Sequence, residues 1–280
     1  MVQRIQALSN SQALVLAGGV FTLFAALPFL FSVYAYLIVG QAHLLQTLLH
    51  QIRAGKVTTR YLFVAGISFI LVTGYLLFSS AFEPLLLIIA LMFALHSVYG
   101  EYKLRGETLD RANVLFGAGA VSVLWAVVAG TVLPYVALLN GLLVFGLCCM
   151  AGRIFLAGPL LPGEQFVLVI VGASLFIAYV AGVPGNVFGA LITLHVLNWT
   201  MYGSALAKTQ GTLLRYWSET AALFFLTGAG FVLYALHAAP LLKYFFDPLY
   251  YYAWSVGHII LTSTLIQQNG ISRLLVFYKK

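Results

Sequence analysis

Stretches of about 20 apolar residues recur along the whole chain, separated by short segments that contain charged residues, glycine or proline. A helix of that length crosses roughly 30 Å of hydrocarbon. Only 8% of the 280 residues are charged and 62% are hydrophobic, whereas a soluble domain carries about 25% charged residues. The sequence therefore predicts an all-α, polytopic transmembrane helix bundle, forming a single integral membrane domain over residues 1–280.

The first apolar stretch, residues 13–51, is longer than one span requires. As a single helix it would be about 58 Å long, and Pro28 would kink or break it. Either it is one long bent helix, or residues 13–27 lie in the membrane interface and residues 28–52 span. We favour a span from about Pro28 to Ile52.

Eight further apolar windows follow, which brings the predicted number of spans to nine. Turn signals such as Ser80–Pro84 and the Gly/Pro segment 158–164 separate them. The windows are residues 61–79, 85–100, 113–131, 134–151, 166–183, 185–206, 216–236 and 249–266.

Basic residues test this number of spans. Strict alternation places 12 of the 14 Lys and Arg residues on one side, with Arg4 and Lys243 opposite. By the positive-inside rule that side is the cytoplasm, and we expect the cytoplasmic membrane of a bacterium or an archaeon. Orientation and lipid headgroups explain the net charge of +7, so nucleic acid is not an expected partner. The 12 residues are Arg53, Lys56, Arg60, Lys103, Arg105, Arg111, Arg153, Lys208, Arg215, Arg273, Lys279 and Lys280.

Four histidines lie within predicted spans that run in the same direction and at overlapping depth: His43, His96, His195 and His258. Ionisable groups at membrane depth are costly and usually face the bundle interior. Imidazole is a suitable ligand for Fe, Zn and Cu. We predict that the four converge on one metal centre, with iron as the metal. The alternative is a set of separate helix–helix hydrogen bonds. His50 and His237 lie at opposite membrane edges and are expected to reach water or headgroups.

Residues around these histidines supply candidates for catalysis and support. His195 shares a helix face with Asn198, Trp199 and Tyr202, as residues three, four and seven apart do. Metal-bound histidines usually need a carboxylate or carbonyl partner, for which the candidates are Glu101, Glu219, Asn198 and Asn140. We name Glu219 and Trp199 as catalytic candidates. Glu219 has an alternative role as the ion-pair partner of Arg215, and Glu101 is expected off the His96 face, at the edge of the loop.

The sequence resembles the bacterial Brp/Blh membrane β-carotene-cleaving dioxygenases in size, helix count and single histidines on several spans. The matching patches are Gly40-Gln-Ala-His43, His96 with Glu101, and Val256-Gly-His258-Ile-Ile. His195 corresponds to the family's H-x-x-x-H helix, with Trp199 in place of the second histidine. The resemblance implies iron held by histidines and an apolar polyene substrate.

Three functions are consistent with these observations. The first is an intramembrane metal-dependent oxygenase that takes a carotenoid or lipid-like substrate through an apolar cleft open to lipid near the inner leaflet. The second is a haem- or chlorophyll-binding protein with axial histidines. The third is a non-catalytic scaffold or lipid carrier whose histidines pack between helices. The expected partners are the lipid bilayer and an apolar small-molecule substrate, and the sequence indicates no particular protein partner.

The predicted topology places the loop at residues 106–110 in the cytoplasm, because most basic residues fall on that side. A cysteine introduced at Thr108 should therefore resist impermeant thiol reagents in intact cells. Ready labelling would contradict the cytoplasmic position of this loop and indicate the opposite orientation in the membrane.

Overall fold

The computed structural model of the chain describes residues 10–27, 36–53, 55, 59–79, 83–105, 111–130, 136–182 and 185–265. These residues form eleven α-helices and no strand, which confirms the all-α prediction. Pro28, Lys56, Thr108, Arg4 and the basic C-terminal residues lie outside them. Most helices match a predicted apolar window to within a few residues, because those windows are bounded by glycine, proline or charge.

The chain divides into two compact units, each built from two segments. Unit 1 contains Met1–Val33 and Glu83–Leu213, and unit 2 contains Tyr34–Phe82 and Leu214–Lys280. The helices of unit 1 are α1 (Asn10–Ala26), α5 (Glu83–Leu104), α6 (Arg111–Gly130), α7 (Val136–Ala157), α8 (Pro162–Leu175) with a π-helical turn η2 (Phe176–Val180), and α9 (Gly185–Thr209).

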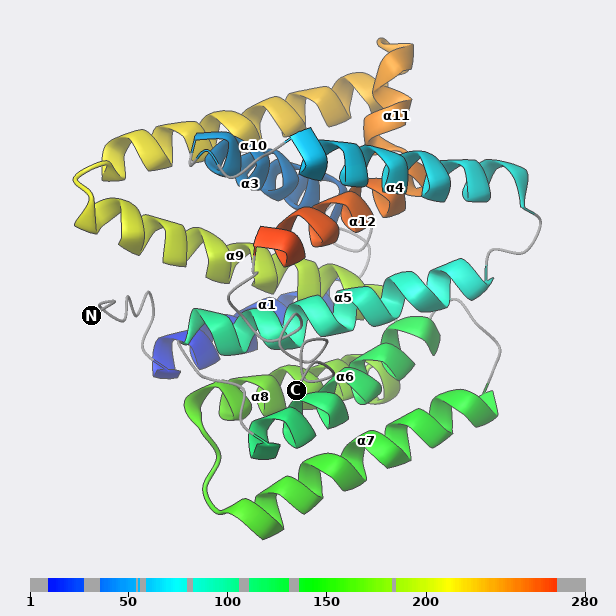
Figure 1. The fold of residues 1–280 in the computed structure, drawn as a ribbon, viewed down its shortest axis with the longest axis vertical. Helices are drawn as coiled ribbons and strands as arrows, with labels where there is room; N and C mark the ends of the chain where they lie inside the picture. The colour runs from blue at the N-terminus through cyan, green and yellow to red at the C-terminus, as the bar shows by residue number, and fades with distance from the viewer. Residues whose placement is uncertain are drawn as a thin grey trace. The chain divides into compact units, whose positions relative to one another are not determined.

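The most extensive packing in unit 1 joins α6 to α7 as a hairpin (Figure 1). Gly119 and Gly146 lie at the crossing. A Cβ atom added to either glycine would lie 2.6 Å from the carbonyl oxygen of the other. Small residues thus let the two backbones approach closely, as is common between membrane helices.

A buried ion pair fixes the turn from α7 to α8. The Arg153 guanidinium donates two hydrogen bonds, of 2.9 and 2.8 Å, to the two carboxylate oxygens of Glu164. Arg153 also donates to the carbonyl of Gly158, and Glu164 accepts from the backbone N–H of Leu161. Both charged side chains are at least 95% buried, so the fork-shaped pairing and the loop backbone replace the water they lose.

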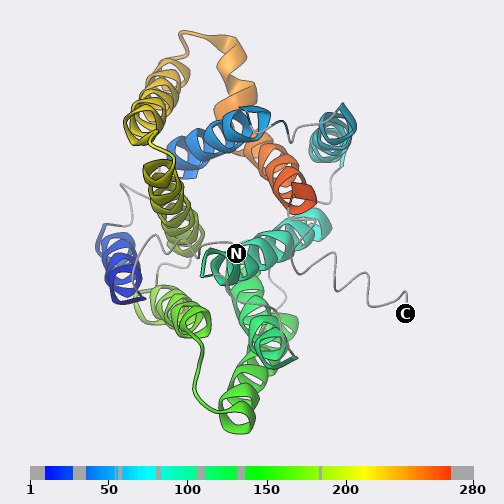
Figure 2. The same cartoon turned by 60° about the vertical axis from the view of Figure 1, so that its left-hand side comes forward.

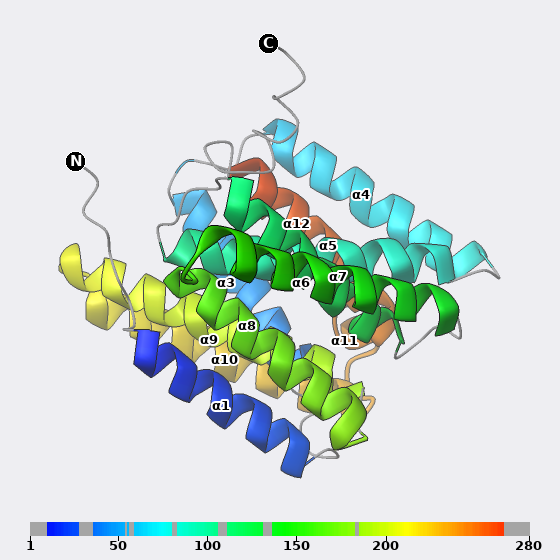
Figure 3. The same cartoon turned by 90° about the horizontal axis from the view of Figure 1, so that it is seen from below.

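Helix α1 ends at Ala26, two residues before Pro28. It lies against α8 and α9 (Figures 2 and 3) and buries Ala17, Phe21 and Phe24. The Asn186 side chain on α9 donates a 2.8 Å hydrogen bond to the carbonyl of Phe24. The segment predicted to lie in the interface is therefore a packed helix of unit 1.

Unit 2 is built from a π-helical turn η1 (Tyr36–Gly40), α3 (Gln41–Arg53), α4 (Thr59–Phe78), α10 (Leu213–Ala235), a short 3-10 turn η3 (Pro240–Leu242), α11 (Lys243–Phe246) and α12 (Pro248–Leu265). Helix α12 packs along α4 (Figure 3), where Phe69 contacts Trp254. Helix α3 is joined to α10 by the buried Gln46, which donates hydrogen bonds to Thr220 (2.7 Å) and the hydroxyl of Tyr216 (3.2 Å).

Five described helices are long and apolar enough to cross a membrane, which is consistent with a membrane protein. Their spanning segments are Glu83–Tyr102, Asn113–Gly130, Val136–Ala157, Pro162–Val180 and Leu213–Ala235. Two shorter apolar helices are Ser11–Ala26 and Ala65–Phe78. Helix α9 has sufficient length, but its buried polar residues lower its hydropathy, and it is not among the five.

The crossing at Gly146 yields a stability prediction. Gly146→Ala should lower the free energy of unfolding by about 1–3 kcal/mol, because the new methyl group meets Gly119 and Val123. Gly141→Ala on the same helix is the matched control, since nothing lies within 4 Å of its added Cβ, and it should be neutral or stabilising by up to about 1 kcal/mol. Chemical unfolding in mild detergent measures both; equal effects would contradict the close crossing.

Candidate histidine site

Unit 1 brings two of the four predicted ligands into direct contact. His96 on α5 and His195 on α9 place their Nε2 atoms 3.2 Å apart, with ring centroids 4.7 Å apart. His195 is buried and His96 is half-buried. The two residues are 99 positions apart in the chain, so the contact arises from the fold alone.

A buried carboxylate joins the same two helices. Glu101 on α5, 2% exposed, accepts hydrogen bonds of 3.1 Å on both carboxylate oxygens from the side-chain amide of Asn198 on α9. It also accepts a 2.6 Å bond from Arg105, whose guanidinium lies over the ring of Phe166 at 3.9 Å. Glu101 is thus a helical, buried residue, and the expected loop-edge position is wrong because α5 continues to Leu104.

These contacts form two polar connections between α5 and α9. His195 and Asn198 are three residues apart, and therefore on one helix face. Gly100 provides space between the helices, since a Cβ there would lie 3.8 Å from both the His195 and Trp199 rings. Glu101 and Asn198 therefore bond to each other in the unit that holds His96 and His195, and their role as partners of metal-bound histidines stays a prediction.

Unit 2 holds the other two predicted ligands. The rings of His43 on α3 and His258 on α12 meet edge to face, with centroids 5.1 Å apart, and each has a ring nitrogen within 4.8 Å of one on the other. Gly40 ends the π-helical turn before α3, and any side chain there would collide with the ring of Tyr251. Single π-helical turns are frequent at functional sites.

The catalytic candidates have different surroundings. Glu219 forms ion pairs with Arg53 and with Arg215, four residues before it. The Arg215 ion pair considered from the sequence is thus present. Trp199 lies 6.1 Å from the His195 ring, centroid to centroid, so its position beside the histidine is as the helix face predicts.

The remaining candidates have other surroundings. His50 stacks on Tyr216, and His237 follows α10 in a left-handed conformation with φ of 55°. Asn140 is exposed on α7. Sequence reasoning missed Arg105, although its position four residues after Glu101 is the spacing of a helical ion pair.

The His96–His195 geometry fits a chelated ion. Two nitrogens each about 2.0–2.1 Å from one ion lie roughly 3.3 Å apart at a tetrahedral angle and about 2.9 Å apart at a right angle. The observed 3.2 Å lies between these values. A hydrogen bond between one neutral donor ring and one acceptor ring has a similar length, so the distance supports both readings.

The same distance bears on haem. Iron held between two axial histidines needs their nitrogens about 4 Å apart on opposite sides of the metal. The 3.2 Å separation of His96 and His195 is shorter than that spacing.

Comparisons with protein-family models, with curated proteins and with solved structures found no match. The candidate site is therefore defined by its own residues. These are two histidine pairs, one in each unit, and the hydrogen-bonded Glu101 carboxylate in the unit of the first pair. Neutral imidazoles suit both metal ligation and mutual hydrogen bonding.

The Glu101 network generates a prediction that does not depend on metal. Arg105→Met should destabilise the protein by about 3–5 kcal/mol, because it removes the cationic partner of a buried carboxylate. Arg215→Met removes an exposed partner of Glu219 and should cost no more than about 1 kcal/mol. Chemical unfolding of the two variants measures both changes. Similar losses of unfolding free energy would contradict the conclusion that the Glu101 ion pair is buried and the Arg215 side chain exposed.

Proposed function

We propose that this chain is a membrane-embedded metal protein that binds iron through its intramembrane histidines. The observation that carries the proposal is the 3.2 Å separation of the Nε2 atoms of His96 and His195. Two neutral imidazoles leave the charge of a divalent ion intact, and the metal uses lone pairs that would otherwise need separate donors in an apolar bundle. His43 and His258 form the second pair of proposed ligands.

The chain's own groups set the environment of the ion. Nε2 of His96 and Nε2 of His195 would hold it, since these two atoms face each other. Glu101 and Asn198 keep α5 and α9 in register beside the pair. The apolar surroundings limit the access of water.

The reaction we propose is oxygenation of an apolar, carotenoid-like or lipid-like substrate. Iron would supply dioxygen activation when bound. Support comes from the sequence resemblance to the Brp/Blh dioxygenases at the segments around His43, His96 and His258, and from Trp199, which offers an aromatic surface beside His195. We do not assign Glu219 a catalytic role here, because two arginines engage its carboxylate.

The proposed setting is a cytoplasmic membrane of a bacterium or an archaeon, crossed nine times. Five described helices meet the length and hydropathy requirements. The distribution of basic residues supports the further crossings and the cytoplasmic position of the loops around residues 54–59, 106–110 and 209–212.

A non-catalytic scaffold or lipid carrier is the second candidate, and the histidine geometry is the observation that favours it. A neutral His96–His195 hydrogen bond would satisfy both rings without an ion. In that case the two rings act as a polar connection between helices, as Gln46 and Thr220 do in unit 2.

Metal analysis of the purified full chain separates these candidates. Wild-type protein loaded with ferrous iron under anaerobic conditions should retain iron through size exclusion. His96→Ala and His195→Ala should each lose at least tenfold in affinity, because a chelate with one nitrogen removed holds the ion by fewer bonds. If all four histidines bind one ion, as the sequence predicts, His43→Ala and His258→Ala should lose the same tenfold in iron affinity.

The matched control is His237→Asn, since asparagine tolerates the left-handed backbone found there. It should leave bound iron unchanged. Iron that is absent from wild-type protein, or is retained equally by all variants, would contradict the metal proposal and favour the scaffold.

A further inference from the structure

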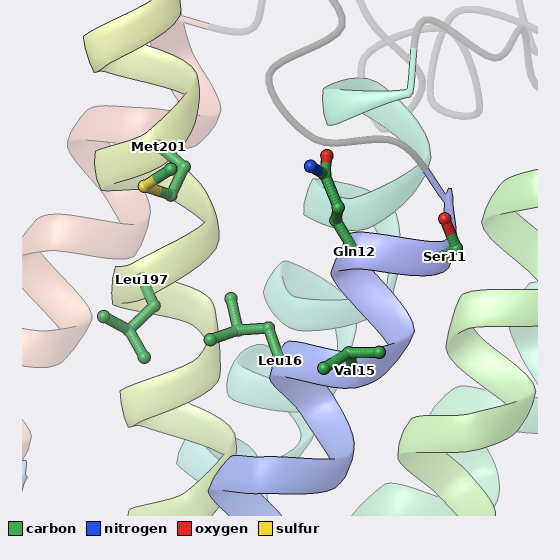
Figure 4. Close-up of a pocket in the computed structure, with 6 residues that line it drawn as sticks. All are labelled: Ser11, Gln12, Val15, Leu16, Leu197 and Met201. Atoms are coloured by element: carbon green, nitrogen blue, oxygen red, sulfur yellow. The ribbon is translucent and has the colours of Figure 1, made fainter.

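Helices α1 and α9 of unit 1 are joined at one end and separate toward the other. The buried hydrogen bond from Asn186 to the carbonyl of Phe24 joins the end of α1 to the start of α9. Toward the start of α1 a cavity of about 470 Å³ opens between the two helices (Figure 4). It is lined by Ser11, Gln12, Val15, Leu16, Leu197 and Met201.

The lining changes character along the cavity. Leu16 extends toward Leu197 in Figure 4, and Met201 lies one helical turn further along α9. Ser11 and Gln12 supply polar groups in the first turn of α1, where the apolar segment Ser11–Ala26 begins. The cavity thus has an apolar interior and a hydrogen-bonding end at the boundary of an apolar helix.

This arrangement matches one class of ligand by polarity and size. Apolar walls without contacting atoms lose dispersion energy, and in a bilayer the groups at hand to fill them are hydrocarbon chains. The volume falls in the range of about 300–1,000 Å³ typical of small-molecule sites. The wedge is open along one side, with Val15 76% exposed, and its residues come from two helices, so we expect one hydrocarbon chain to lie along it.

We propose that the wedge between α1 and α9 binds a single-chain lipid, with its hydrocarbon tail along Leu16 and Leu197 and its polar head at Ser11 and Gln12. The proposal rests on the proposed function in its choice of a lipid-like ligand, and it adds a site for a linear, single-tailed amphiphile whose lining contains none of the candidate histidines. It does not require a metal, so the two proposals can fail separately.

The test is photolabelling of the purified full chain with a long-chain fatty acid that carries a diazirine near the end of its tail. We expect the label to concentrate around Leu16 and Leu197, which line the tail end of the wedge, in peptide mapping, and unlabelled fatty acid to compete with it. Leu197→Trp and Leu16→Phe fill the wedge from its two walls, and each should reduce labelling there at least fivefold. Two substitutions from different helices guard against the misfolding of either one.

Val144→Trp is the matched control. Val144 is an apolar residue that is 63% exposed on α7, and its replacement should leave labelling of the wedge unchanged. Labelling spread over exposed apolar helices, without competition, would identify ordinary boundary lipid and overturn the proposal. Wedge labelling that persists in both filled variants would also overturn it, and iron content measured on the same samples shows whether the metal proposal holds independently.

Discussion

Polar side chains buried in an apolar helix bundle must find partners within the bundle, and this constraint governs the structure. An unpaired polar group in hydrocarbon costs several kcal/mol. The polar contacts that join the described helices include His96 with His195, Glu101 with Asn198, and Arg153 with Glu164. Because lipid is as apolar as leucine, such contacts and close glycine crossings, rather than hydrophobicity, decide which helices pair.

The polar contacts divide into structural and chemical kinds. Arg153 and Glu164 pair with each other and with the backbone of the adjacent loop. The histidine pair differs, because two Nε2 atoms that face each other at 3.2 Å can share a proton or a metal ion. A fold that needed only a polar connection between α5 and α9 already has one in Glu101 and Asn198. The contact between His96 and His195 is thus a second polar connection between the same two helices.

Much of the fold could be predicted from the sequence, because membrane helices are bounded by charge, glycine and proline. The windows at residues 113–131 and 216–236 correspond to α6 and α10 within about three residues. For the segment before Pro28 the sequence left a bent helix and an interfacial segment open, and the structure shows a helix that ends at Ala26 and packs through Phe21 and Phe24. The nine-span topology stays a prediction.

The site was predictable in part for the same reasons. Depth and helix direction singled out the four histidines, and two of them meet in each unit. Sequence spacing could not show that Asn198 would reach Glu101, 97 residues away, since contacts between helices depend on their rotation and crossing. Arg105 was overlooked although the helical rule for ion pairs identifies it.

X-ray absorption spectroscopy of the iron-loaded chain tests the central claim most directly, because it reports the atoms bound to the ion. The account predicts a first shell with at least two nitrogens at about 2.0–2.2 Å and the outer-shell scattering of imidazole rings, which His195→Ala diminishes. A first shell of oxygen alone, unchanged by that substitution, would contradict a histidine-bound ion in the membrane.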